Sequence, residues 1–232
     1  MKTSNILLTV AVALFVLVSL SSNLVLKNQF DKIDKNDKFY GFTKHPVSAF
    51  RYVHLKGKGF ALTQIESGTS PEIRMLTLPQ YMDLKMSGDT LVMTYKPDWE
   101  LGYQPRGGGF GSLPSIYIIA PKLEGIISDN VRCVVKDYRF DDLTVIQKGD
   151  GLLLNNSSVR NLTATISDYA YLKLNPDSRI ETANIDIRDS STLNAEKDIF
   201  KDFHARIDSS AYISMPGSML KKMMTGNKIT PR

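Results

Sequence analysis

The stretches LTATISDYAYLKL (162–174), ANIDIRDSSTLNA (183–195) and FHARIDSSAYISM (203–215) share one pattern. Each begins with an apolar strand that alternates with polar residues, passes a corner rich in Asp or Ser, and continues as a second alternating strand. Two earlier stretches, starting at Leu123 and Leu143, continue the pattern, so that the five starts are 20, 19, 21 and 20 residues apart. Such a period is typical of stacked repeats, because one unit cannot bury its apolar face alone.

The alternation also predicts which side chains face the core. Successive residues of a strand point to opposite faces, so every second residue from each start is expected to point inward. Asp and Gly are expected at the corners because they tolerate a tight backbone. The expected inward columns are Ile127, Ile166, Ile187 and Ile207, and Cys133, Leu153, Leu172, Leu193 and Ile213. This arrangement predicts an all-β, single-stranded β-solenoid with rungs of about 20 residues.

The stretch before the repeats contains shorter strand signals. FRYVHLKGKGFALTQIE predicts a hairpin around Gly57-Lys58-Gly59, and YMDLKMSGDTLVMTY predicts a turn at Ser87-Gly88-Asp89. SIYIIAP reads as a strand that ends at Pro121. Residues 50–120 are therefore expected to form hairpins and the first strands, and residues 121–219 the regular rungs.

A loop rich in Gly and Pro separates these strands. Its run Gly107–Gly111 is followed by Ser-Leu-Pro rather than Lys and a helix, which favours a flexible loop over a phosphate-binding one. The neighbouring Trp99, Tyr103 and Phe110 could decorate a binding loop or cover an open edge of the sheet.

The N-terminus carries a membrane signal. Ile6 to Leu26 is a run of 21 uncharged residues preceded by Lys2, long enough as a helix to span about 30 Å. A cleaved signal peptide would end near Ser19-x-Ser21. We favour an uncleaved anchor over residues 1–27, because the apolar run resumes at Leu24 and contains no Ala-x-Ala site. Residues 28–49 are then a charged linker, 50–219 the folded domain and 220–232 a cap or tail.

Orientation and charge narrow the possible partners. Lys2 favours an N-terminus inside, which predicts a single-pass membrane protein with its domain in the periplasm or at the cell surface; secretion after cleavage is the alternative. Of 29 basic residues, six lie at the two ends of the chain, which leaves 23 against 24 acids. The body therefore lacks the basic excess that nucleic acid requires.

Cysteine and histidine usage predicts no metal site and no disulfide. Cys133 is the only cysteine and falls in an expected core column, as a small buried residue. The three histidines have no metal-like spacing. No cofactor, metal ligand or catalytic residue is predicted.

Residues 50 to about 219 resemble the family known as "putative auto-transporter adhesin, head GIN domain" of Bacteroidota. The resemblance rests on VHLKGKGFALTQIESG, GDTLVMTY, SIYIIAPKLEGI and repeated units such as LTATISDYAYLKL. It implies a right-handed solenoid on a protein outside the cytoplasm. Here the corners carry mostly Asp in place of the family's glycines, and the family supplies no catalytic residues to assign.

The outward positions of the repeats are the candidate sites. One expected column contains Arg132, Leu152, Tyr171 and Tyr212, with Tyr169 beside it, and could hold a glycan or an envelope protein. The same aromatics could simply pack on neighbouring rungs. The predicted function is therefore a non-enzymatic, adhesin-like or envelope interaction module.

A second outward patch leaves an enzymatic alternative open. With a 20-residue offset, Asp186 is expected to stack on Arg206 and Arg188 on Asp208. Acids and bases on such a face serve carbohydrate-active β-helix enzymes, as polysaccharide lyases or hydrolases. Alternating charges along each column instead favour ion pairs between rungs, which would add little stability.

Overall fold

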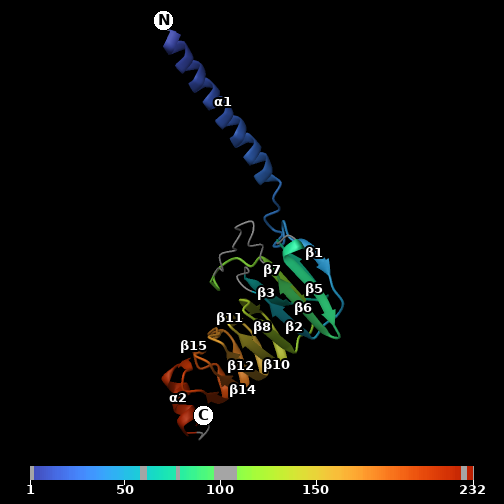
Figure 1. Ribbon diagram of the computed structural model, residues 1–232, viewed down its shortest axis with the longest axis vertical. Helices are drawn as coiled ribbons and strands as arrows, with labels where there is room; N and C mark the ends of the chain where they lie inside the picture. The colour runs from blue at the N-terminus through green and yellow to red at the C-terminus, as the bar shows by residue number, and fades with distance from the viewer. Residues whose placement is uncertain (1–2, 58–61, 77–78, 97–108, 226–228, 232) are drawn as a thin grey trace. The chain divides into compact units, whose positions relative to one another are not determined.

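The computed structural model describes residues 3–57, 62–76, 79–96, 109–225 and 229–231, which fall into two compact units, Met1–Phe42 and Thr43–Arg232. The first unit contains helix α1 (Thr3–Asp31) (Figure 1). Its segment from Asn5 to Asp31 is long and apolar enough to cross a membrane, a property that signal sequences share.

Polar side chains inside α1 are bonded within the helix. Thr9 Oγ1 donates to the carbonyl of Asn5 over 2.8 Å, and Ser21 Oγ donates to the carbonyl of Leu17 over 2.8 Å. Asn23 bonds in the same way, four residues back. A helix that enters hydrocarbon must satisfy its polar groups internally, so these bonds make α1 compatible with a bilayer.

The second unit consists of two nine-stranded sheets. Sheet A has the order β1 (Thr43–Pro46), β4 (Glu72–Met75), β7 (Ile116–Ala120), β3 (Thr63–Ser67), β9 (Cys133–Lys136), β11 (Gly151–Asn155), β13 (Tyr171–Leu174), β15 (Thr192–Ala195) and β17 (Tyr212–Ser214). Sheet B has the order β18 (Ile229–Pro231), β16 (Phe200–Ile207), β14 (Arg179–Ile187), β12 (Ser158–Ser167), β10 (Arg139–Lys148), β8 (Gly125–Asp129), β2 (Tyr52–Lys56), β6 (Thr90–Tyr95) and β5 (Met82–Ser87). A 3₁₀ turn, η1 (Pro79–Tyr81), and helix α2 (Gly217–Thr225) complete it.

The predicted fold class, a single-stranded right-handed β-solenoid over residues 50–219, is wrong. The strands belong to two separate sheets of mixed pairing. In sheet A, β4 runs antiparallel to both β1 and β7, and in sheet B, β5 runs antiparallel to β6. The sequence before Gly125 lacks the 20-residue period, and the strands there do not all pair in parallel as stacked repeats would.

From β8 onward the chain alternates between the two sheets. Each repeat contributes one strand to sheet B, turns a corner, and contributes the next strand to sheet A, and successive strands pair in parallel (Figure 1). Ile166 is in register with Ile187, and Ile187 with Ile207, as the repeat predicted. The corner residues Asp168 and Asp189 have φ of 60° and 51°, so Asp does occupy the left-handed conformation there.

The predicted columns are wrong in the first two repeats. Ile166 is in register with Gln147, and Gln147 with Ser128, so Ile127 points outward and Ile126 lies in the core. In sheet A, Leu152 rather than Leu153 is in register with Cys133 and Leu172. The corner is the cause: Leu152 comes five positions after Gln147, whereas Leu172 comes six positions after Ile166.

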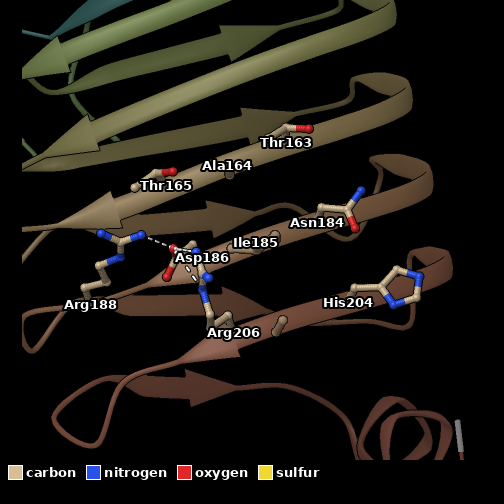
Figure 2. A pocket seen from close by; sticks show the side chains of 10 residues that line it. Thr163, Ala164, Thr165, Asn184, Ile185, Asp186, Arg188, His204 and Arg206 are labelled. Carbon is tan, nitrogen blue, oxygen red and sulfur yellow. Dashed lines mark hydrogen bonds and ion pairs between the residues drawn. The ribbon is translucent and has the colours of Figure 1, made fainter. Parts of the chain in front are cut away.

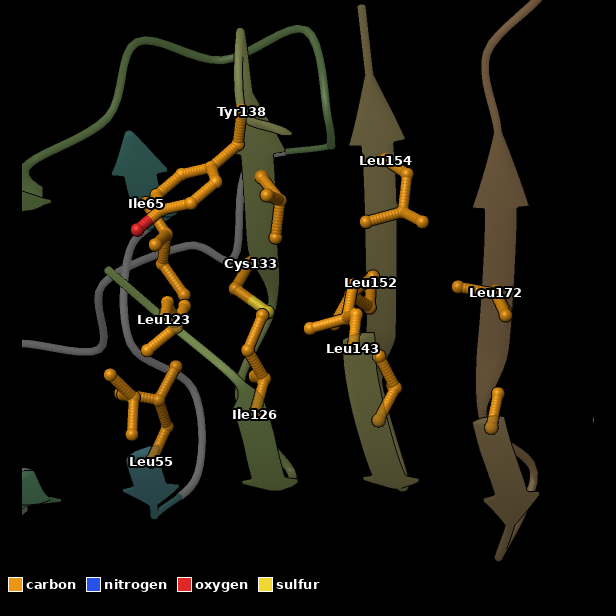
Figure 3. Close-up of a cluster of buried hydrophobic side chains, with 14 of the residues drawn as sticks. Leu55, Ile65, Leu123, Ile126, Cys133, Tyr138, Leu143, Leu152, Leu154 and Leu172 are labelled. Carbon is orange, nitrogen blue, oxygen red and sulfur yellow. The ribbon is translucent and has the colours of Figure 1, made fainter. Parts of the chain in front are cut away.

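Apolar side chains from both sheets form one continuous core. Figure 3 shows Cys133, Leu152 and Leu172 of sheet A facing side chains such as Ile126 and Leu143 of sheet B. Cys133 and Leu152 are fully buried. Burial raises the pKa of the Cys133 thiol to about 12, so the cysteine is a small apolar core residue, as predicted.

The segments flanking the repeats differ from expectation. No hairpin forms around Gly57, because β2 pairs with β6 and β8 in sheet B while β3 pairs with β7 and β9 in sheet A; residues 58–61 lie outside the described part of the chain. The β5–β6 hairpin at Ser87-Gly88-Asp89 is confirmed. Strand β1 lies within the stretch expected to be a linker, and α2 buries Met219 against the core.

Candidate functional site

Two outer surfaces carry the side chains that the sequence singled out. The first is the outer side of sheet A, which we call the tyrosine face. Parallel register places Gly151, Tyr171, Thr192 and Tyr212 in one row across β11, β13, β15 and β17. Arg132 immediately precedes Cys133, the partner of Leu152, so it lies beside Gly151 in this row.

Leu152 does not belong to the tyrosine face. Its side chain is 0% exposed and points into the core. The prediction that Leu152 is a surface residue is therefore wrong. The cause is the short corner described above, which shifts the strand by one residue and exchanges its two faces. Gly151 takes its place in the row.

One end of the tyrosine face is covered by Phe110. The ring lies 6.3 Å from the Tyr171 ring and 5.8 Å from the guanidinium carbon of Arg132, whose Nε also donates to Asp150 over 2.6 Å. A Cβ on Gly151 would come within 2.8 Å of the Phe110 ring, so a larger residue there would push the ring from its present position. Of the three loop aromatics, Phe110 thus covers the sheet, whereas Trp99 and Tyr103 lie outside the described residues.

The other end of the tyrosine face is open. Tyr212 is 66% exposed on the terminal strand of sheet A, and Tyr169 is 80% exposed at the corner that leads into β13. Tyr169 has φ of 61°, a conformation that costs an aromatic side chain free energy. The equivalent corner position in the next repeat is Ser190, with φ of 56°.

The second surface is a shallow groove of about 620 Å³ on the outer side of sheet B (Figure 2). Its floor crosses β12, β14 and β16. Register aligns Thr163 with Asn184 and His204, and Thr165 with Asp186 and Arg206. We call this surface the sheet B groove; its lining residues are Thr163, Ala164, Thr165, Asn184, Ile185, Asp186, Arg188, His204, Ala205 and Arg206.

Asp186 is the electrostatic centre of the groove. Its Oδ2 accepts hydrogen bonds from Arg188 and from Arg206, the latter over 2.6 Å. These guanidiniums, Arg188 first, lower the pKa of the carboxyl to about 2. The predicted pairing of Asp186 with Arg206 is confirmed, and the guanidinium of Arg188, the residue directly after β14, also bonds to Asp186. Asp208 accepts from the backbone N–H of Asp189 and Ser210, and its charge also acts on Arg188.

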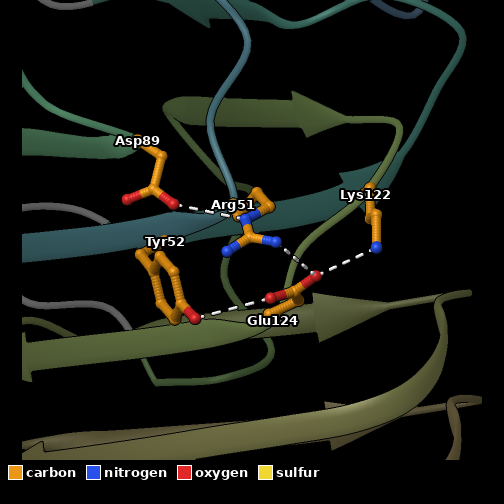
Figure 4. A network of polar contacts seen from close by, with 5 residues as sticks. All are labelled: Arg51, Tyr52, Asp89, Lys122 and Glu124. Atoms are coloured by element: carbon orange, nitrogen blue, oxygen red, sulfur yellow. Dashed lines mark hydrogen bonds and ion pairs between the residues drawn. The ribbon is translucent and has the colours of Figure 1, made fainter.

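A third polar cluster has a structural role. Arg51 contacts Asp89 over 3.2 Å and Glu124 over 3.4 Å, and Lys122 contacts Glu124 over 3.0 Å (Figure 4). The Lys122 contact, first among several, holds the pKa of Glu124 below its usual range. Because the backbone N–H of Arg51 also donates to the Asp89 carbonyl, the cluster joins the start of β2 to the β5–β6 turn and the start of β8.

Sequence reasoning identified the tyrosines and the Asp186–Arg206 pair but missed Phe110 as their neighbour and Asn184 and His204 as part of a groove. The groove residues could have been found, because offsets of 21 and 20 residues align Thr163, Asn184 and His204 once the register is known. Among the described residues, no cluster of three or more His, Cys, Asp or Glu side chains could hold a metal ion.

Comparison with known proteins places the fold. No family model and no curated protein matches the chain. A solved structure described as a "putative adhesin" from Parabacteroides merdae ATCC 43184 has a TM-score of 0.52 at 13% identity, covering 75% of this chain and 80% of that one. A "putative lipid binding protein" from Parabacteroides distasonis ATCC 8503 has a TM-score of 0.55 at 12% identity, covering 75% and 72%. Membership of the head GIN domain family is not confirmed; at these identities the chain shares a fold with proteins of Bacteroidota, some of them described as putative adhesins.

Proposed function

We propose that the chain is a membrane-anchored, non-enzymatic adhesin-like module whose folded body lies outside the cytoplasm, in the periplasm or at the cell surface. Helix α1 supports anchoring by its length and by its internally bonded polar side chains. Lys2, before the helix, supports an N-terminus that stays inside. The shared fold with a protein described as a "putative adhesin" supports the adhesin-like role.

The observation that carries the proposal is the exposure of two tyrosines, one on the tyrosine face and one beside it. Tyr169 and Tyr212 expose most of their side chains, whereas a neighbouring repeat has the smaller Ser190 or Thr192 at the equivalent position. Tyr212 on the last strand of sheet A and Tyr169 at the corner before β13 offer a large contact area with little entropy to lose on binding. The strained backbone of Tyr169 is consistent with selection for contact rather than for stability. The partner is a glycan or an envelope protein.

The state of the acidic side chains supports binding over catalysis. A general acid or base near neutral pH needs a pKa close to that pH. The Asp186 carboxyl has a pKa of about 2 and is held by two guanidiniums, so it neither donates nor accepts protons at pH 7. Asp208 is engaged by the corner backbone and by the hydroxyl of Ser210. These contacts count against a polysaccharide lyase or hydrolase.

The binding role is tested with the full chain in lipid nanodiscs. Binding to a glycan array and to isolated cell envelopes is compared with that of the variant Tyr169→Ser with Tyr212→Thr, which installs the residues found at Ser190 and Thr192. We expect the variant to fold and to lose binding. Tyr40→Ser, at a tyrosine 47% exposed in the first unit, is the matched control. Unchanged binding by the double variant would refute the tyrosine face as the contact surface.

Anchoring is tested separately by fractionation. The intact chain should remain with the membranes after a carbonate wash, with its N-terminal segment still attached. A soluble product that has lost α1 would support cleavage and secretion instead.

A further inference from the structure

We infer that the sheet B groove is a binding site for an uncharged saccharide. The inference rests on the proposed function in one respect, because both assign a glycan as a partner of this module. The groove lies on sheet B rather than on the tyrosine face of sheet A, and it would bind the glycan through hydroxyl, amide and charged side chains rather than through tyrosine rings.

The groove floor is polar and open to solvent. The Thr163 and Thr165 hydroxyls and the Asn184 amide point out of strands β12 and β14 (Figure 2). Among the described residues, these two hydroxyls and this amide make no hydrogen bond to another side chain. Hydroxyl and amide groups donate and accept at once, which is what recognition of a sugar hydroxyl requires.

The charged members of the groove are fixed in place. The Arg206 guanidinium donates through Nε and Nη2 to the same Asp186 oxygen, over 3.2 and 2.6 Å. The Asp186 side chain is 13% exposed and cannot swing away without breaking these bonds. His204 is oriented in turn by Asp202, 3.1 Å from Nε2. Fixed planar side chains lower the entropic cost of binding a ligand through directed hydrogen bonds.

The balance of charge favours a neutral ligand. The two guanidiniums face the Asp186 carboxylate directly, and Asp189 and Asp208 also act on Arg188. Asp202 adds a fourth carboxylate beside His204. The charged side chains that line the groove are thus already paired, so an ionic ligand of either sign would have to displace an existing partner.

The size and shape of the groove fit a short piece of a sugar chain. Its volume of about 620 Å³ lies within the range of ligand sites. It crosses three strands, or roughly 10 Å at the usual inter-strand spacing, which is the scale of a disaccharide unit. Ala164, Ile185 and Ala205 are buried between the polar columns, so only the polar side chains of these strands project from the floor.

The test uses the full chain in nanodiscs and soluble cello-, malto-, chito- and polygalacturonate oligomers, with affinity measured by titration calorimetry. The groove variant is Thr163→Val with Asn184→Leu, which keeps shape and removes hydrogen-bonding groups. The matched control is Thr144→Val, whose residue is the register partner of Thr163 on β10, outside the groove. Thermal unfolding of each variant confirms that the fold is kept.

We expect one of the neutral oligomers to bind the parent chain and to bind the groove variant at least tenfold more weakly. The reason is that each lost uncharged hydrogen bond weakens binding by about fivefold. The control and the Tyr169→Ser/Tyr212→Thr variant should bind as the parent does. Binding lost in the tyrosine variant but kept in the groove variant would overturn the groove site and leave the adhesin-like role intact. Binding to polygalacturonate alone, or to no oligomer, would also overturn it.

Discussion

Leucines 152 and 153 provide a direct test of the register that the structure assigns. Leu152 is fully buried in the main core between Cys133 and Leu172. Leu153 points to the other side of sheet A, where it packs with Leu62, Val134 and Phe110. The sequence pattern assigned these two leucines to the opposite faces, so truncating each in turn distinguishes the two arrangements.

The magnitudes follow from what surrounds each side chain. Truncating a buried leucine costs about 2–5 kcal/mol, and more where the site cannot collapse. The backbone of β11 is bonded to β9 and β13 on both sides, so the cavity left by Leu152→Ala cannot close, and we expect about 4 kcal/mol. For Leu153→Ala we expect about 1.5 kcal/mol, because Phe110 can settle into the space.

The assay is thermal unfolding of the full chain in mild detergent, followed by the loss of β-sheet circular dichroism. At about 2–4 °C per kcal/mol for a body of this size, Leu152→Ala should lower Tm by roughly 8–16 °C and Leu153→Ala by roughly 3–6 °C. Leu113→Ala, at a residue 92% exposed, is the control and should leave Tm unchanged. An equal or larger loss from Leu153→Ala would refute the register.

Four further predictions follow from single sites. Cys133 should resist a thiol reagent at pH 8 in the native state and react in urea, because burial raises its pKa to about 12; rapid native labelling would contradict its burial. Asp186 has a folded-state pKa below its ordinary value, so its stabilising contribution is complete above pH 4 and lost as pH falls toward 2; we expect about 1 kcal/mol, after allowance for solvent screening, and a flatter Tm profile in Asp186→Asn. Gly57→Ala should cost about 2–3 kcal/mol, since φ is 128° and a Cβ would lie 2.7 Å from Tyr95 Cβ, whereas Gly88→Ala, with φ of 61° and open space, should cost about 1 kcal/mol; equal losses would show that crowding is unimportant. Tyr169→Asn should raise stability by about 0.5–1 kcal/mol in urea unfolding, because Asn accepts the left-handed backbone more readily, and a loss of stability would mean that the tyrosine ring is a structural contact.

Much of the local structure was predictable from the sequence. The alternation in residues 162–215 placed the isoleucine column of β12, β14 and β16 correctly, and the Asp-rich corners took up the left-handed backbone that their composition indicated. The apolar N-terminal run gave a single long helix. Each of these features depends on neighbours along the chain, which a sequence pattern reports directly.

The candidate sites were only half predictable. Tyr212 is exposed as expected, because its neighbours set the phase of β17, and Tyr169 is exposed at the corner before β13. Leu152 was misplaced because alternation cannot be carried through a corner whose length varies by one residue. Phe110 was missed as a neighbour of Tyr171, because the contact joins residues far apart in sequence.

What the sequence by itself determined is the repeat, its period and the apolar helix before it, since these follow from side-chain periodicity and hydrophobicity. What only the tertiary structure decided is the division into two mixed sheets, the phase of the first two repeats and the groove across β12, β14 and β16. The physical reason is the same in each case. Strand pairing and corner geometry are settled by hydrogen bonds and packing between distant segments, and a change of one residue in a corner exchanges the inner and outer faces of the strand that follows.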